Sequence, residues 1–208
     1  MLNLLKKCIK RTHKIFSEFW SIIHCNRFLK TNDLIDANSI FTHLTCEEKK
    51  MLFELASQKK MGVFVEIGSY LGASTSFIAA AIDDDKAKLF CVDTWNNETM
   101  PDGEKDTYQS FIINIEKFRQ KITPLRGKST NVAKAFTEKV DFLFIDGDHS
   151  YNAVKADVVS WLPKLKSDAI IIFHDIGWAE GVQKVIQEDV SPKVIAEGRL
   201  PNMYWAWL

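Results

Sequence analysis

The sequence is poor in cysteine and lacks the spacings that give cysteine a structural role. Its four cysteines are Cys8, Cys25, Cys46 and Cys91, and no two of them form a C-x-x-C pair. Metal-binding cysteines and disulfide frameworks usually appear as close, repeated spacings. The pattern therefore argues against a zinc site and a disulfide scaffold. It predicts reduced thiols and a cytoplasmic protein.

Long apolar runs and an excess of one charge are also missing. The apolar start of the chain is interrupted at Ser17, Glu18 and Ser21, and no small-residue cleavage site follows. We therefore expect neither a signal peptide nor a membrane-spanning helix. Lys and Arg together number 27, as do Asp and Glu. A chain with zero net charge is not built as a whole to bind nucleic acid.

The composition that is present suits a folded domain preceded by a basic helix. Hydrophobic residues make up 46% of the 208 residues, enough for a sizeable core. Residues 2–29 combine apolar positions at helical spacing with many lysines, which predicts an amphipathic helix. A second helix is expected over residues 41–56, where Thr45 and Glu48 have capping-box spacing. We predict an N-terminal helix and connection over 1–44 and one domain over 45–208.

From residue 61 onward, strand-like and helix-like segments alternate. This rhythm predicts an α/β fold, with a doubly wound, seven-stranded and mostly parallel sheet. The last two strands are joined by a short turn at Pro201 and Asn202, too short for a crossover, so they must form an antiparallel pair. The expected strands are residues 61–68, 88–95, 121–129, 139–148, 168–176, 193–200 and 202–208.

Polar residues gather where these expected strands end. The carboxyl ends of parallel strands meet at one edge of a sheet, where ligands bind in α/β proteins. Such clustering is hard to explain by packing alone. The residues are Glu66, Gly68 and Gly72, then Asp93, Thr94 and Trp95, then Gly127, Lys128 and Ser129, then Asp146, Asp148 and His149, and finally His174 and Asp175.

The first of these loops reads E-x-G-x-x-x-G and differs from the dinucleotide fingerprint G-x-G-x-x-G. A carboxylate before the first glycine would repel a phosphate but suits an ammonium group. Asp93, at the end of the next strand, can accept hydrogen bonds from two ribose hydroxyls. A nucleoside that carries an amino acid fits this pair better than a dinucleotide does.

On the segments EIGSYLGAS and CVDTW, the sequence resembles the class I S-adenosylmethionine-dependent methyltransferases over residues 45–208. The resemblance implies that Glu66 and Gly68 hold the methionine part of the cofactor and that Asp93 holds its ribose. It also places Ser129 beside the adenine. Gly72, Thr94 and Asp146 complete the expected cofactor site. Trp95 either covers the adenine or belongs to the core.

The segments FIDGDHSY and IIFHDIG bring a second group of ionisable residues to the same edge. Burying so many of them is costly without a partner, and a divalent cation is one such partner. The pattern is similar to metal-dependent sugar O-methyltransferases that modify macrolide and aminocoumarin antibiotics. That resemblance implies metal ligands at Asp146, His174 and Asp175, and a general base at Asp148 or His149.

Several alternatives remain open at this site. His174 stands where those relatives carry an acid, and imidazole favours manganese over magnesium. The acidic residues could instead form a structural cluster or a metal-free acid–base arrangement. Asp148 or His149 could simply cap the following helix.

The favoured function is therefore methyl transfer from S-adenosylmethionine to a hydroxyl of a sugar, glycan or other small acceptor, assisted by a divalent cation (Mg or Mn). The alternatives are an NAD-dependent oxidoreductase and a binding module without turnover. The helix over residues 2–29 would dock on its own domain, dock on a second subunit of a homodimer, or contact a membrane surface peripherally.

Overall fold

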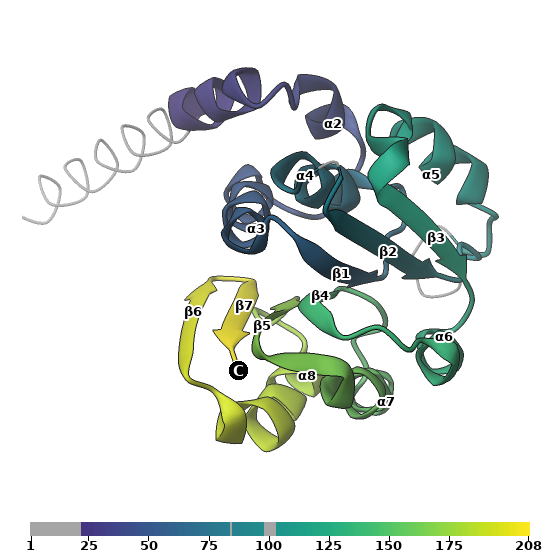
Figure 1. The fold of residues 1–208 in the computed structure, drawn as a ribbon, viewed down its shortest axis with the longest axis vertical. Coiled ribbons are helices and arrows are strands. Elements are labelled where there is room, and N and C mark those ends of the chain that lie inside the picture. The colour runs from purple at the N-terminus through teal and green to yellow at the C-terminus, as the bar shows by residue number, and fades with distance from the viewer. Residues whose placement is uncertain (1–21, 84, 98–102) are drawn as a thin grey trace, which may run out of the picture.

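The fold is known from a computed structural model that describes residues 22–83, 85–97 and 103–208. Its centre is one seven-stranded sheet in the order β3-β2-β1-β4-β5-β7-β6 (Figure 1). Strand β7 runs antiparallel to both β5 and β6, and the other neighbouring strands are parallel. The predicted fold class is confirmed. The strands are β1 (Gly62–Ile67), β2 (Ala87–Asp93), β3 (Ile122–Arg126), β4 (Val140–Ile145), β5 (Leu165–His174), β6 (Ala196–Leu200) and β7 (Met203–Trp207).

Helices cover both faces of this sheet, as Figure 1 shows. Alternate residues of a strand point to opposite faces, so Phe64 packs with the helices of one layer and Val65 with those of the other. The first layer is α2 (Ile35–Ser39), α3 (Cys46–Lys59), α4 (Ala73–Ala81) and α5 (Tyr108–Asn114), and the second is α6 (Ser129–Ala135), α7 (Tyr151–Trp161) and α8 (Glu180–Val185). The sheet is therefore buried on both sides, and its carboxyl-terminal edge remains for a site.

The second predicted helix begins later than expected. The capping box is confirmed: Thr45 Oγ1 accepts from the Glu48 backbone N–H, and Glu48 Oε2 accepts from the Thr45 N–H at 2.7 Å. This exchange starts α3 at Cys46, so residues 41–45 form a non-helical connection instead of the first turn.

The prediction of reduced thiols is wrong for two cysteines. Cys25 and Cys46 form a disulfide with their Cα atoms 6.4 Å apart, whereas Cys91 is free and buried. The end of the helix over residues 22–31 packs against the first layer, where the Phe28 and Phe53 ring centroids lie 5.2 Å apart. A tertiary contact of this kind leaves no local spacing in the sequence.

Most of the predicted helix over residues 2–29 lies outside the described residues. Its docking on the domain, on a second subunit or on a membrane surface stays a prediction. Leu29, Leu34 and Leu44 are buried in the core of the first layer. The boundary between residues 44 and 45 stays a prediction. Within the described ranges, no helix is long and apolar enough to cross a membrane, and the cytoplasmic location stays a prediction as well.

Candidate active site

A cavity of about 840 Å³ opens at the carboxyl ends of the parallel strands. Every strand from β1 to β5 contributes to its wall through its last residue or the loop that follows. Among the predicted site residues, those on the wall are Gly68, Asp93, Thr94, Ser129, Asp146, Asp148, His149, His174 and Asp175. The structure therefore brings nine of the predicted residues into one cavity, and Glu66 and Gly72 lie outside its wall.

The glycine loop between β1 and α4 passes extremely close to the end of β4. Gly68 has a φ of +87°, and a Cβ atom added there would lie 2.1 Å from the carbonyl oxygen of Asp146. Gly72 has a φ of +88° and precedes the first residue of α4. Only glycine adopts such angles without a steric penalty. The two glycines therefore set the turn, and Gly68 gives the backbone access to the cavity.

Glu66 lies beneath this loop and is completely buried. Its Oε2 accepts hydrogen bonds from Ser69 Oγ at 2.7 Å and from Thr75 Oγ1, and Oε1 has no hydrogen-bond partner. Burial raises the pKa of the Glu66 carboxyl group. In this arrangement the carboxylate supports the loop from below. A direct contact with the methionine part of a cofactor stays a prediction.

Asp93, at the end of β2, joins the loops that follow β1 and β2. Its Oδ2 accepts from the Tyr70 backbone N–H at 2.8 Å, and its Oδ1 accepts from the Trp95 N–H at 2.6 Å. Burial raises the pKa of its carboxyl group. Trp95 itself is fully buried, and its Nε1 donates to the Tyr70 carbonyl at 3.0 Å. Trp95 was expected either to cover the adenine or to belong to the core, and the structure shows it in the core.

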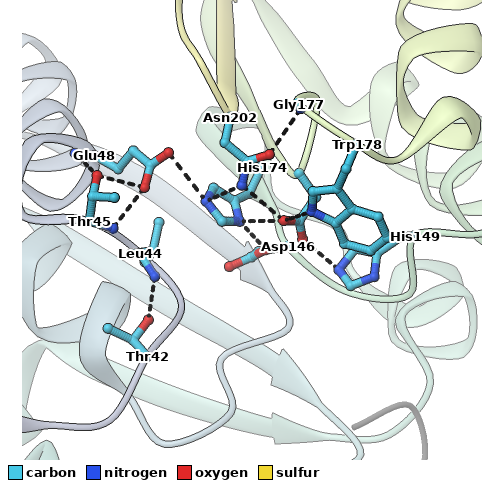
Figure 2. A network of polar contacts seen from close by, with 11 residues as sticks. Thr42, Leu44, Thr45, Glu48, Asp146, His149, His174, Gly177, Trp178 and Asn202 are labelled. Atoms are coloured by element: carbon cyan, nitrogen blue, oxygen red, sulfur yellow. Dashed lines mark hydrogen bonds and ion pairs between the residues drawn. The ribbon is translucent and has the colours of Figure 1, made fainter. Parts of the chain in front are cut away.

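His174 is the centre of a buried polar network (Figure 2). Its Nδ1 lies 3.2 Å from Asp146 Oδ1 and 3.3 Å from Asp175 Oδ1. On the other side of the ring, Nε2 faces Glu48 Oε1 at 3.6 Å and Asn202 Nδ2 at 3.3 Å. Burial lowers the pKa of His174, but the three carboxylates outweigh it and raise the pKa to about 12. The three carboxylates therefore favour the protonated form of the ring.

Asp175 is held by donors on both of its oxygens. Oδ1 accepts from Trp178 Nε1 at 2.8 Å and from Asn202 Nδ2 at 3.0 Å, while Oδ2 pairs with His149 Nε2 at 2.6 Å. Burial alone would raise its pKa, but the two histidines hold the pKa well below its usual range. Asp175 also has a φ of +62°, uncommon for a residue other than glycine. Such a backbone angle at a ligand cavity is typical of functional positions.

Three of these side chains lie close enough together to hold a metal ion. The ligand atoms of Asp146, His149 and Asp175 all lie within 4.8 Å of one another. His174, predicted as the third ligand, lines the same cavity and has both ring nitrogens engaged by protein groups, and its role as a ligand stays a prediction. His149 is therefore the imidazole that lies together with both acids in this cluster. Its pKa is raised, first by its hydrogen bond to Asp175 and against the opposing effect of burial.

Asp148, the other base candidate, is exposed and turned towards the following helix. Its Oδ1 accepts from the Ser150 backbone N–H at 2.7 Å. Ser150 in turn caps α7 through its hydroxyl group, which accepts from the Ala153 N–H. The N-cap of α7 is therefore Ser150. Neither Asp148 nor His149 caps this helix, so the capping alternative is wrong for both.

Sequence reasoning missed several residues in and around this site, among them Glu48, Asp157, Trp178 and Asn202. The sequence indicates Glu48 only as half of a capping box and Asn202 only as part of a short turn. Both meet His174 from distant parts of the chain. Trp178 follows the β5 aspartate by three residues, and that spacing was the one local signal available for it.

Comparison with known proteins agrees with this geometry. Residues 65–176, more than half of the chain, match a family described as "Methyltransferase domain". An uncharacterised protein, y4gI of Sinorhizobium fredii (strain NBRC 101917 / NGR234), is 32% identical over 116 residues. That stretch covers 53% of this chain and only 13% of the relative.

Solved structures share the fold at low sequence identity. An O-methyltransferase of Bacillus cereus in complex with SAH has a TM-score of 0.65 at 16% identity, covering 88% of this chain and 90% of its own. The O-methyltransferase TomG of Streptomyces achromogenes has a TM-score of 0.63 at 14% identity, covering 79% and 80%. CalS11, a TDP-rhamnose 3'-O-methyltransferase of calicheamicin biosynthesis, has a TM-score of 0.60 at 14% identity, covering 76% of each chain. The fold, the cavity and the family match together establish that the chain belongs to the methyltransferase-domain family and is an S-adenosylmethionine-dependent methyltransferase.

Proposed function

We propose that this methyltransferase methylates a hydroxyl group on a small, ring-containing acceptor such as a sugar. The cluster of Asp146, His149 and Asp175 carries the proposal, because it lines the same cavity as the glycine loop and Asp93. Methyl transfer from a sulfonium is an in-line displacement, so the acceptor oxygen must be positioned and must lose its proton. The cluster supplies groups for both tasks.

His149 is the residue best placed to take that proton. Asp175 holds its Nε2 at 2.6 Å, which leaves Nδ1 for the acceptor hydroxyl. Asp175 is itself fixed by Trp178 and Asn202. An imidazole oriented by a carboxylate is a common general base near neutral pH. Asp148 is more exposed and already accepts a backbone hydrogen bond, so the geometry favours His149.

The same three side chains suit a divalent cation. Two carboxylates and one imidazole, with ligand atoms within 4.8 Å of one another, form a donor set that favours manganese over magnesium. Such an ion, when bound, would orient the acceptor oxygen and lower its pKa. His149 would then be a ligand, and Asp148 would be the nearest remaining base. The same site could therefore remove the proton with or without a bound metal ion. Only the metal-assisted mechanism would lose activity when a chelator removes the ion.

We expect turnover to require a divalent cation. Formation of SAH would be followed with methyl glycosides and catechol as acceptors, in excess EDTA and after adding back Mn²⁺ or Mg²⁺. EDTA should abolish turnover, and Mn²⁺ should restore it at least as well as Mg²⁺. Full activity in EDTA would contradict the metal mechanism and leave the His149–Asp175 pair as the base. No turnover of any acceptor with metal present would favour the binding-module alternative.

Exposed aromatic rings form part of the cavity wall. Phe41 and Trp178 both line the cavity although more than half of each side chain is exposed. The Phe41 ring lies 6.5 Å from that of Tyr70, and the Trp178 ring lies 4.9 Å from that of His149. Exposed aromatic faces beside a polar cluster are suited to stacking on a flat or ring-shaped acceptor. This wall supports a sugar or phenol over an extended aliphatic acceptor.

Cofactor affinity should depend strongly on Asp93. Removing a carboxylate that accepts hydrogen bonds from a ligand costs about 1.5–3 kcal/mol, so Asp93→Ala should weaken S-adenosylmethionine binding by roughly ten- to a hundredfold. Calorimetric titration measures the change, and circular dichroism checks the fold because Asp93 also holds two loops. Asp36→Asn, an exposed change outside the cavity, is the control. Unchanged affinity in folded Asp93→Ala would refute the ribose assignment.

A further inference from the structure

Glu48, in the first turn of α3, is a buried carboxylate with a contact outside its capping box. Only 3% of its surface is exposed. Its Oε2 accepts from the backbone N–H of Thr45 at 2.7 Å and from the Thr45 hydroxyl group at 2.8 Å. Its Oε1 faces His174 Nε2 at 3.6 Å. One oxygen therefore serves the start of the helix, and the other serves the polar network of the candidate site.

The capping box alone does not explain why residue 48 carries a charge. Glutamine serves at this position of a capping box as well as glutamate does. Burying a charged group is costly unless an opposite charge or hydrogen bonds compensate. Glu47 lies in the same turn, is exposed, and already gives the helix N-terminus an acidic group. The contact with His174 is therefore the feature that a neutral residue 48 would lose.

His174 connects this carboxylate to the acids of the candidate site (Figure 2). Its Nδ1 lies 3.2 Å from Asp146 Oδ1 and 3.3 Å from Asp175 Oδ1, on the side of the ring opposite Glu48. Asn202 Nδ2 lies 3.3 Å from Nε2 and also donates to Asp175. An imidazole ring is rigid, so its two nitrogens cannot turn independently. A carboxylate that holds Nε2 therefore also sets the direction in which Nδ1 meets the two acids.

We propose that Glu48 is a positioning residue for methyl transfer, acting through His174 on the carboxylates of Asp146 and Asp175. Glu48 is not among the described residues that line the cavity, so it acts on the reaction only through other side chains. Asp175 pairs with His149 Nε2 at 2.6 Å, which extends the chain of contacts to the proposed base. The inference rests on the proposed function for the role of His149 in proton removal, whereas the contacts themselves do not depend on it.

The first test follows the histidine rings in Glu48→Gln, which loses the charge but keeps a side chain suited to the capping box. NMR of chains with ¹⁵N-labelled histidine, at one fixed pH, reports the ring nitrogens, and circular dichroism checks the fold. The ring resonances of both His174 and His149 should shift, although the contact of Glu48 is with His174. Glu47→Gln removes an exposed charge from the same turn and should shift neither ring. Wild-type His149 resonances in folded Glu48→Gln would overturn the proposal.

A second comparison separates positioning from a direct effect of the lost charge. In a His174→Gln background the link to the acids is missing, so adding Glu48→Gln should no longer shift the His149 resonances. If Glu48→Gln shifts His149 equally in both backgrounds, the charge acts through space, and the positioning role is wrong.

Turnover connects the contacts to the reaction. With methyl glycosides and catechol as acceptors, Glu48→Gln should lower kcat by roughly ten- to a hundredfold, because it misplaces groups beside the acceptor. The KM for S-adenosylmethionine should stay unchanged, and Glu47→Gln should match wild type in both constants. A wild-type kcat in folded Glu48→Gln would overturn the positioning role even if the resonances shift. If the wild-type chain methylates no acceptor, the proposed function fails, and the two NMR comparisons still decide whether Glu48 acts through His174.

Discussion

Replacing Gly68 with alanine should abolish cofactor binding and lower the free energy of unfolding by about 2–5 kcal/mol. Two costs add at this position. A residue with a Cβ atom is strained at a φ of +87°, and that atom would lie 2.1 Å from the Asp146 carbonyl oxygen. The obstacle is backbone, so no side-chain rotation relieves it. Either the glycine loop or the end of β4 must move, and both line the cavity in which we propose the cofactor binds.

Gly103→Ala is the matched control for this substitution. Gly103 has a φ of +80°, but nothing lies within 4 Å of a Cβ atom added there. It should therefore cost only the backbone strain, about 1–2 kcal/mol, and leave cofactor affinity unchanged. Urea unfolding and calorimetric titration with S-adenosylhomocysteine measure the two effects. If Gly68→Ala binds within about twofold of wild type, the close approach does not shape the cofactor site.

Reducing the Cys25–Cys46 disulfide should lower the free energy of unfolding by about 3 kcal/mol, the value expected for a loop of this size. The bond closes a separation of 21 residues and fastens the helix over residues 22–31 to the start of α3. Without it, the unfolded chain regains loop entropy. The measurement is urea unfolding with and without dithiothreitol.

A double variant, Cys25→Ser with Cys46→Ser, provides the control. It should match the reduced wild-type chain in stability and no longer respond to dithiothreitol. Proteolysis under non-reducing conditions should also yield one linked pair of peptides containing Cys25 and Cys46. If dithiothreitol does not change the stability of the wild-type chain and no linked pair of peptides is found, Cys25 and Cys46 are reduced thiols, as the sequence predicted.

The sheet and most of the cavity wall could be predicted because their signals are local. Apolar runs such as residues 139–145 mark buried strands, and polar residues directly after them must lie at the carboxyl edge. Even the antiparallel pairing of β7 with β6 followed from a two-residue connection. Helix α6 could not be predicted from the sequence. Its seven residues, Ser129–Ala135, are too few to show a helical period that differs from a loop.

The parts that could not be predicted depend on contacts between distant segments. Nothing in the capping box of α3 indicates that Glu48 also reaches His174, since one oxygen serves the cap and the other serves the ring. The resemblance placed His174 among the metal ligands by alignment of motifs alone. Its contacts with Glu48 and Asn202 depend on segments that only the folded chain brings together (Figure 2).

The placement of β7 between β5 and β6 has a consequence for synthesis of the chain. Until the final hairpin has been made, β5 pairs only with β4 and leaves the apolar stretch Ile170–Phe173 as an open edge. Open hydrophobic edges are sites of intermolecular pairing. The nascent chain is therefore most prone to aggregate just before its last strand docks. The same hairpin brings Asn202 to Asp175, so the segment that covers the open edge also supplies a contact that holds a residue of the candidate site.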